Sequence, residues 1–88
     1  MKAAFRKSYV KDLEKPRDTE VRGRIREAIG RAERAETLQD VGDIRRLRGG
    51  EGTYWIRVGD HRLGLILDRE SVVFARCLHR KDLYRYFP

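Results

Sequence analysis

Apolar and polar residues alternate along three short segments in the second half of the chain, at residues 53–58, 61–67 and 71–78. A period of two is typical of β-strands with one buried face, because successive side chains point to opposite sides of a sheet. Gly59 and Asp60 separate the first two segments, and residues 68–70 separate the next two, which favours tight turns. The pattern predicts an antiparallel meander of three strands.

In the first half of the chain, apolar residues recur mainly at intervals of three and four positions. Apolar residues keep this spacing from Val21 to Ala35, which predicts an amphipathic helix that Asp18 can cap. A shorter helix is expected from Ser8, a plausible N-cap, and Pro16 ends it. Three further segments complete the prediction, namely an edge strand, a connection and a C-terminal helical turn, at residues 2–6, 37–53 and 81–86.

These elements predict an α+β domain in the order β-α-α-β-β-β, with a short helical turn at its C-terminal end. Two N-terminal helices would pack on one face of a small antiparallel sheet. With 88 residues, the chain has the length of a single domain over residues 1–88.

Strand parity sorts the side chains of the meander onto two faces. Packing under the helices is expected for the all-apolar sets Tyr54, Ile56, Val58, Leu63, Leu65, Leu67, Val73, Ala75 and Cys77. Arginine is almost never buried without a partner, so the other face should be uncovered. That face is expected to carry Trp55, Arg57, Arg62, Gly64, Ile66, Val72, Phe74, Arg76, Leu78 and Arg80.

Composition adds a positive charge to this picture. Lys and Arg number 21 against 14 Asp and Glu, so the formal net charge is +7 and the isoelectric point is about 10.1. Such an excess favours a polyanionic partner, namely RNA, DNA, an acidic membrane face or an acidic protein segment. A solvated basic surface without a ligand remains the alternative.

The single cysteine and the distribution of apolar residues bear on disulfides, membrane insertion and secretion. Cys77 is the only cysteine, so an intramolecular disulfide is impossible, and a small buried hydrophobe is the expected role. No apolar segment approaches the roughly 20 residues that span a bilayer. The first 15 residues lack the apolar core of a secretion signal. A cytoplasmic location is expected.

The chemistry of the uncovered face points to single-stranded nucleic acid. Arginine binds phosphate through a rigid fork of donors, and aromatic rings stack on unpaired bases. The alternative is that the arginines bond carbonyls of the sheet or pair with nearby carboxylates, of which the candidates are Asp60, Asp68 and Asp82.

Three stretches of the chain, FRKSYVKDLEK at residues 5–15, IRRLRGGEGTYWIRVGDHRLGLIL at 44–67 and LHRKDLYRYF at 78–87, resemble the RelE/ParE superfamily of type II toxin–antitoxin toxins. The RelE-like mRNA interferases are the more similar branch. The resemblance implies helices on an antiparallel sheet with a basic concave face. It also implies cleavage of mRNA in the ribosomal A site without a metal or other cofactor, by attack of a 2′-hydroxyl that leaves a 2′,3′-cyclic phosphate.

The resemblance carries catalytic roles to particular positions. Arg62 matches the hairpin arginine that contacts the scissile phosphate, Arg80 a basic position that supports the transition state, and Tyr84 an aromatic that stacks on a base or assists proton transfer. Arg57 stands where some members have a lysine proposed as the base, and arginine is a poor base. His79 is then the natural candidate for an active nuclease, with a structural hydrogen bond as its alternative role.

Further residues are predicted to contact RNA, namely Trp55, Arg76, Lys81, Arg45, Arg46 and Arg48. Trp55 occupies another position that is basic in relatives, and it could stack on a base or be covered by an antitoxin. His61, in place of a tyrosine, is expected to be an exposed turn residue.

The resemblance implies a cognate antitoxin, whose acidic segment would wrap the toxin in a hetero-oligomer, and contacts with mRNA and ribosomal RNA. Two alternatives stay open. One is a ParE-like poison of DNA gyrase, and the other is a degenerate homologue that binds RNA or antitoxin without turnover.

Overall fold

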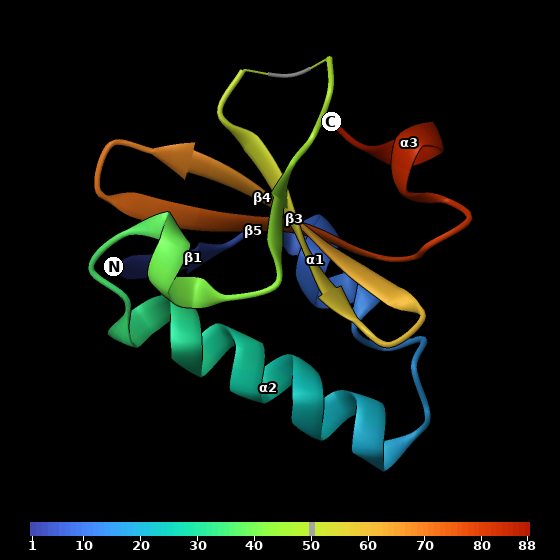
Figure 1. Cartoon of the computed structure of the whole chain (residues 1–88). Helices are drawn as coiled ribbons and strands as arrows, with labels where there is room; N and C mark the ends of the chain where they lie inside the picture. The colour runs from blue at the N-terminus through green and yellow to red at the C-terminus, as the bar shows by residue number, and fades with distance from the viewer. Residues whose placement is uncertain (50) are drawn as a thin grey trace.

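A computed structural model describes residues 1–49 and 51–88, and Gly50, inside the predicted connection, lies outside the described residues. Its strands are β1 Lys2–Phe5, β2 Ile44–Arg46, β3 Thr53–Val58, β4 His61–Asp68 and β5 Ser71–His79. They form one five-stranded sheet in the order β1-β5-β4-β3-β2 (Figure 1). The strands β2 to β5 form an antiparallel meander, and β1 pairs in parallel with β5 at an edge. The predicted α+β fold, edge strand and three-strand meander are confirmed.

The helix α2, Thr19–Arg34, packs against the sheet through its predicted apolar stripe. Asp18 is the N-cap as predicted, and its carboxylate accepts a hydrogen bond from the Glu20 amide at 2.9 Å. Side chains of the stripe contact the strands and form the main core with them, in which the helix contributes Ile25, Ala28 and Ala32. Local periodicity and one capping residue were therefore enough to predict this helix.

The short helix α1, Lys7–Asp12, lies against β5, and its N-terminus differs from the prediction. Arg6, not Ser8, is the N-cap, and no side chain caps the helix. The Ser8 hydroxyl instead donates a hydrogen bond of 2.7 Å to the carbonyl oxygen of Ala75 in β5. Ser8 therefore joins the helix to the sheet.

The segment predicted as a connection contains two elements that the pattern did not indicate. A 3₁₀ helix, η1 Leu38–Val41, is followed by β2, whose three residues pair with β3. The sequence of β2, Ile-Arg-Arg, is too short and too polar to alternate. Pairing with the longer β3 decides that this segment is extended.

The assignment of faces on β5 is wrong over its first half, because the strand contains a bulge. The register passes from Gly64–Arg76 to Leu65–Phe74, so Ala75 is an additional residue on β5. The extra residue reverses the parity of the strand. Side chains before the bulge are exchanged between the faces, so the main core receives Val72 and Phe74 instead of Val73 and Ala75.

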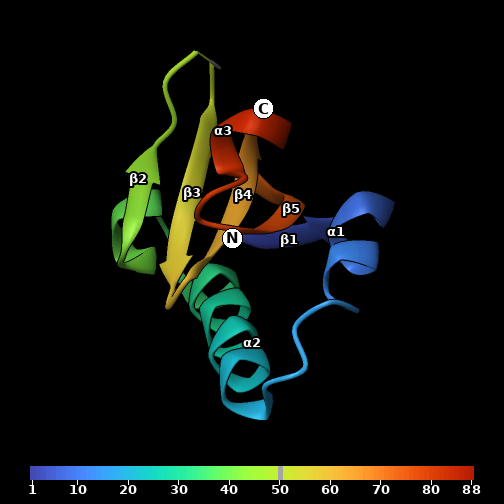
Figure 2. The same ribbon diagram turned by 90° about the vertical axis from the view of Figure 1, so that its right-hand side faces the viewer.

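The face predicted to be uncovered is partly covered by the C-terminal segment. The helix α3, Leu83–Tyr86, lies against this part of the sheet (Figure 2). Leu83 and Phe87 form a second apolar cluster with Leu47, which follows β2, and with Ala75 and Leu78 of β5. A Cβ on Gly64 would lie 2.8 Å from the Phe87 ring, so the glycine admits this ring onto β4. The chain itself therefore packs closely on the β4 backbone at Gly64.

Candidate nucleic-acid interface

Three arginines gather beside the turn between β3 and β4. Arg57 and Arg62 are cross-strand partners, and Arg80 directly follows β5. Burial lowers the pKa of Arg62, and the charges of Arg57 and Arg80 lower it further, so both cations are close enough to repel Arg62. We call Arg57, Arg62 and Arg80 the arginine cluster.

Little negative charge offsets the arginine cluster. The Nε atom of Arg80 lies 3.9 Å from Oδ1 of Asp60, and the two side chains are 61% and 70% exposed. An exposed pair at this distance contributes little and is screened by salt. Both forms of the alternative are thus present in part, because Asp60 pairs weakly with Arg80 and Arg62 bonds carbonyl oxygens of the hairpin, but no carboxylate is bonded to Arg62 in these contacts.

Arg62 is the most firmly held member of the arginine cluster. Its Nη1 atom donates hydrogen bonds to the carbonyl oxygens of Gly59, at 2.8 Å, and His61, at 2.9 Å. Its guanidinium carbon lies 5.0 Å from the centroid of the Trp55 ring. Neutral carbonyls and a ring fix the orientation of the group and leave its positive charge available to a ligand.

Arg76 shares this face, but its guanidinium group is engaged inside the chain. Its Nε and Nη2 atoms donate to the Asp12 carboxylate at 2.7 and 3.1 Å, and this bond raises the pKa of Arg76. Asp12 is buried and also accepts from the Cys77 amide at 3.0 Å. Arg76 therefore anchors α1 to β5, and we leave it out of the RNA-binding set.

The two histidines lie on the opposite face from the arginine cluster. His61 and His79 are cross-strand partners in line with Val58 of the main core, and their ring centroids are 6.0 Å apart. Burial lowers the pKa of His61, and His79 adds to this effect. The Nδ1 atom of His79 accepts a hydrogen bond from the Lys81 amide at 3.2 Å. The structure thus separates His79 from Arg62, and His61 is half-buried rather than exposed.

The C-terminal segment presents Tyr84 to solvent. Leu83 and Phe87 are buried in the second apolar cluster, whereas Tyr84 is 67% exposed. Lys81 is exposed between β5 and α3. The buried residues fix the segment on the sheet face that carries Trp55, and leave these two side chains accessible.

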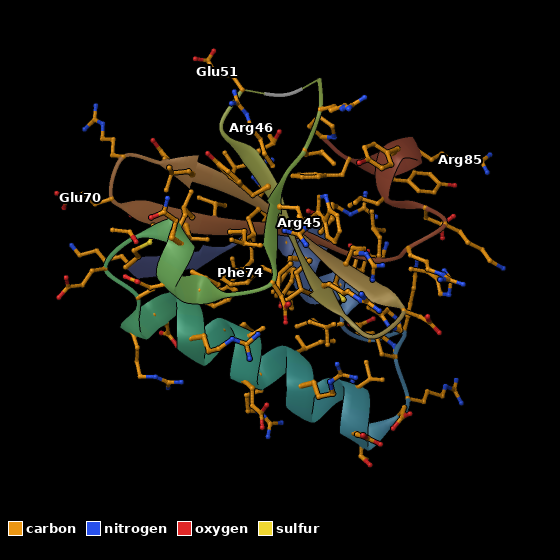
Figure 3. The ribbon with its side chains drawn as sticks, viewed as in Figure 1. Arg45, Arg46, Glu51, Glu70, Phe74 and Arg85 are labelled. Carbon is orange, nitrogen blue, oxygen red and sulfur yellow. The ribbon has the colours of Figure 1, made fainter. Side chains whose placement is uncertain are left out.

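The arginines of residues 45–48 fall on different sides. Arg45 pairs with Trp55 and so shares the face of the arginine cluster, whereas Arg46 pairs with Tyr54, which packs on the main core (Figure 3). Arg48 is exposed in the loop after β2. The structure therefore brings Arg45, but not Arg46, to the candidate interface.

Sequence reasoning missed two residues that hold this interface together, Asp12 and Phe87. Asp12 looks like a solvated helix residue, and nothing in its local pattern indicates a partner 64 positions away. For Phe87, the available signal was an apolar side chain in the C-terminal segment. Cys77 is buried as predicted, and burial raises its pKa to about 12.

Within residues 1–49 and 51–88, no group of three histidine, cysteine or acidic residues is placed to hold a metal ion. A helix long and apolar enough to cross a membrane is likewise missing from this part of the chain.

Comparison with known proteins identifies relatives of the whole chain. No profile of a known protein family matches it. Toxin RelE3 of Methanocaldococcus jannaschii is 39% identical over 89 residues, which cover 100% of each protein.

Solved structures give the same result. A chain of the RelB-RelE antitoxin-toxin complex from Methanococcus jannaschii superposes with a TM-score of 0.81 at 35% identity, covering 97% of this chain and 99% of that one. A chain of the toxin-antitoxin complex RelBE2 from Mycobacterium tuberculosis superposes with a TM-score of 0.70 at 26% identity, covering 90% of this chain and 96% of that one. Because the similarity to RelE3 extends over the full length of both proteins, the chain belongs to the RelE family of toxins.

Proposed function

We propose that this chain is the toxin of a type II toxin–antitoxin system and acts as a ribosome-dependent, metal-independent mRNA endoribonuclease. Membership of the RelE family supports the role as a toxin, and the arginine cluster supports the nuclease activity. The observation that carries the proposal is the state of Arg62, which is oriented by two carbonyls and a ring without a carboxylate partner among those contacts.

The proposed reaction is an internal transfer within the RNA. The 2′-oxygen attacks the adjacent phosphorus, the bond from phosphorus to the 5′-oxygen breaks, and a 2′,3′-cyclic phosphate and a 5′-hydroxyl result. One proton leaves the 2′-hydroxyl and one reaches the 5′-oxygen, so the charge that develops between these steps lies on the non-bridging oxygens. Arg62, with Arg80 beside it, stabilises that charge by directed N–H donors.

The face of the arginine cluster carries few side chains that could transfer a proton. Arginine is a poor general base, so the role of Arg57 is electrostatic. His79 faces the other side of the sheet, and the exposed phenol of Tyr84 is the group that we assign to stacking on a base or to proton transfer. A site without a well-placed base depends on substrate orientation, which is the part that we assign to the ribosome.

An antitoxin with an acidic segment is the proposed partner. The structurally similar RelE chain from Methanococcus jannaschii was solved in a complex of antitoxin and toxin. The net charge of +7 on this chain complements an acidic segment. Covering the arginine cluster would remove the potential that attracts RNA.

Induced expression in a bacterium, followed by primer extension on a reporter mRNA, tests the proposal. We expect discrete breaks that appear only in translated regions and disappear when a neighbouring antitoxin gene is co-expressed. Arg62→Ala should strongly reduce the breaks, and Arg46→Ala is the matched control because it removes the same charge from the other face. Breaks in purified mRNA without ribosomes would contradict the ribosome dependence. Growth arrest with intact mRNA and inhibited DNA supercoiling would contradict the nuclease.

A further inference from the structure

Trp55 is already in contact with two parts of the protein. Its ring lies 5.0 Å from the guanidinium carbon of Arg62, and the side chain packs against the second apolar cluster. The register explains the first contact, because Trp55 pairs with Gly64, two residues along β4 from Arg62 on the same face. The side chain is half-buried. A nucleotide base would have to displace Arg62 to stack on that side of the ring.

We propose that Trp55 is a positioning residue for Arg62 and not a stacking platform for RNA, an inference that rests on the proposed nuclease function. The indole face supports the guanidinium plane, while the carbonyls of Gly59 and His61 hold Nη1. Both N–H groups of Nη1 are then used inside the hairpin. The three N–H groups on Nε and Nη2 are not used in these contacts, and they form an edge that can donate two parallel hydrogen bonds to a phosphate.

The neighbouring charges explain why Arg62 needs such support. Burial is the main cause of the lowered pKa of Arg62, and repulsion of its guanidinium group by Arg57 and Arg80 adds to this effect. Asp60 is the opposing charge near this group, and it is largely exposed. A flexible arginine under this repulsion would turn towards solvent. The ring provides attraction without neutralising the charge.

Tryptophan fluorescence tests the contact independently of any activity, because Trp55 is the only tryptophan in the chain. In Arg62→Ala, the emission maximum should move to longer wavelength, and acrylamide quenching should rise by about twofold, because one face of the ring loses its cover. Arg46→Ala is the matched control, since it removes an arginine from the opposite face of the adjacent strand. Unchanged emission and quenching in Arg62→Ala would overturn the proposal even if the chain cleaves no RNA.

Cleavage on the ribosome tests the positioning role itself. In single-turnover reactions, Trp55→Leu should lower the maximal rate about tenfold and leave the half-saturating ribosome concentration within about twofold. Trp55→Phe keeps an aromatic face and should remain within about threefold of the parent rate. Ile66→Ala is the control for lost packing, because Ile66 belongs to the same apolar cluster as Trp55.

A double mutant separates positioning from stacking. If Trp55 acts through Arg62, Trp55→Leu should have no further effect in an Arg62→Ala background. If Trp55 were a stacking platform, Trp55→Leu would instead weaken ribosome binding to the same extent in both backgrounds. That result would refute the proposal. Circular dichroism and a urea midpoint establish that each variant is folded. If Trp55→Leu is unfolded, the fluorescence of Arg62→Ala still tests the proposal.

Discussion

Arg62 and Arg76 lie on neighbouring strands and share one face of the sheet, yet their surroundings differ in one respect. Each guanidinium carbon lies over an aromatic ring, Trp55 at 5.0 Å and Tyr86 at 5.9 Å. Arg76 also makes a two-pronged ion pair with the buried Asp12, whereas Arg62 is held by carbonyl oxygens. A carboxylate uses the charge that a ligand would need, and a carbonyl does not. Orientation and neutralisation are therefore separate properties of a buried or half-buried arginine.

The two regions serve different purposes as a result. Around Arg76, the bulge residue Ala75 and the amide of Cys77 find partners in Ser8 and Asp12 of α1. Their bonds attach the helix to the sheet. Around Arg62, the same sheet presents three cations to solvent with one weak opposing pair.

Replacing the two arginines should give the largest contrast. We expect Arg62→Ala to lower the single-turnover cleavage rate at least about 100-fold, the scale of one lost donor to a developing oxyanion. Arg76→Ala should leave the rate per folded molecule within about threefold, because its charge is already paired. Primer extension with ribosome-bound mRNA measures both rates. Equal losses in the two variants would remove the distinction drawn between these sites.

Arg80→Ala should have an intermediate effect. Its side chain is exposed and only weakly paired, so it contributes charge rather than a fixed geometry. We expect about a tenfold loss of cleavage rate, equivalent to ~1.4 kcal/mol in the transition state. Arg80→Lys keeps the charge and should recover most of the rate. Full growth arrest from a folded Arg80→Ala protein would show that Arg80 does not stabilise the transition state.

Asp12→Asn tests the opposite side of the comparison through stability. The substitution removes a charge-assisted pair and weakens a bond to the Cys77 amide, so the free energy of unfolding should fall by about 2 kcal/mol. Urea denaturation should show a lower midpoint at an unchanged m-value. The folded fraction should still cleave at the parent rate. An unchanged midpoint would mean that the ion pair does not anchor α1.

The smallest expected effect separates Arg45 from Arg46. Both are exposed on β2, but only Arg45 shares the face of Trp55. Arg45→Gln should reduce the dependence of log affinity for single-stranded RNA on log salt by roughly 0.7, the contribution of one phosphate contact. Arg46→Gln should leave that dependence unchanged. Equal slopes for both variants would show that strand parity does not define the binding surface.

Sequence patterns were sufficient for the parts of the fold that are governed by local spacing. The period of two gave β3, β4 and β5, and Asp18 with the apolar stripe after it gave α2. On β3 and β4 parity also placed Trp55, Arg57 and Arg62 on the correct face, because those strands contain no bulge. It failed on β5 before Ala75, where one additional residue exchanges the faces.

The sequence by itself therefore determined the α+β class, the excess of positive charge and which arginines leave the hairpin on one face. Tertiary structure decided which of those arginines keep their charge. Asp12 reaches Arg76 across 64 positions of the chain, and Phe87 reaches Gly64 from the C-terminal segment. Periodicity reports only neighbours within a turn or a strand. Contacts between distant segments depend on how the elements pack, so a charge can be counted in the sequence but assigned to a ligand or to the fold only in three dimensions.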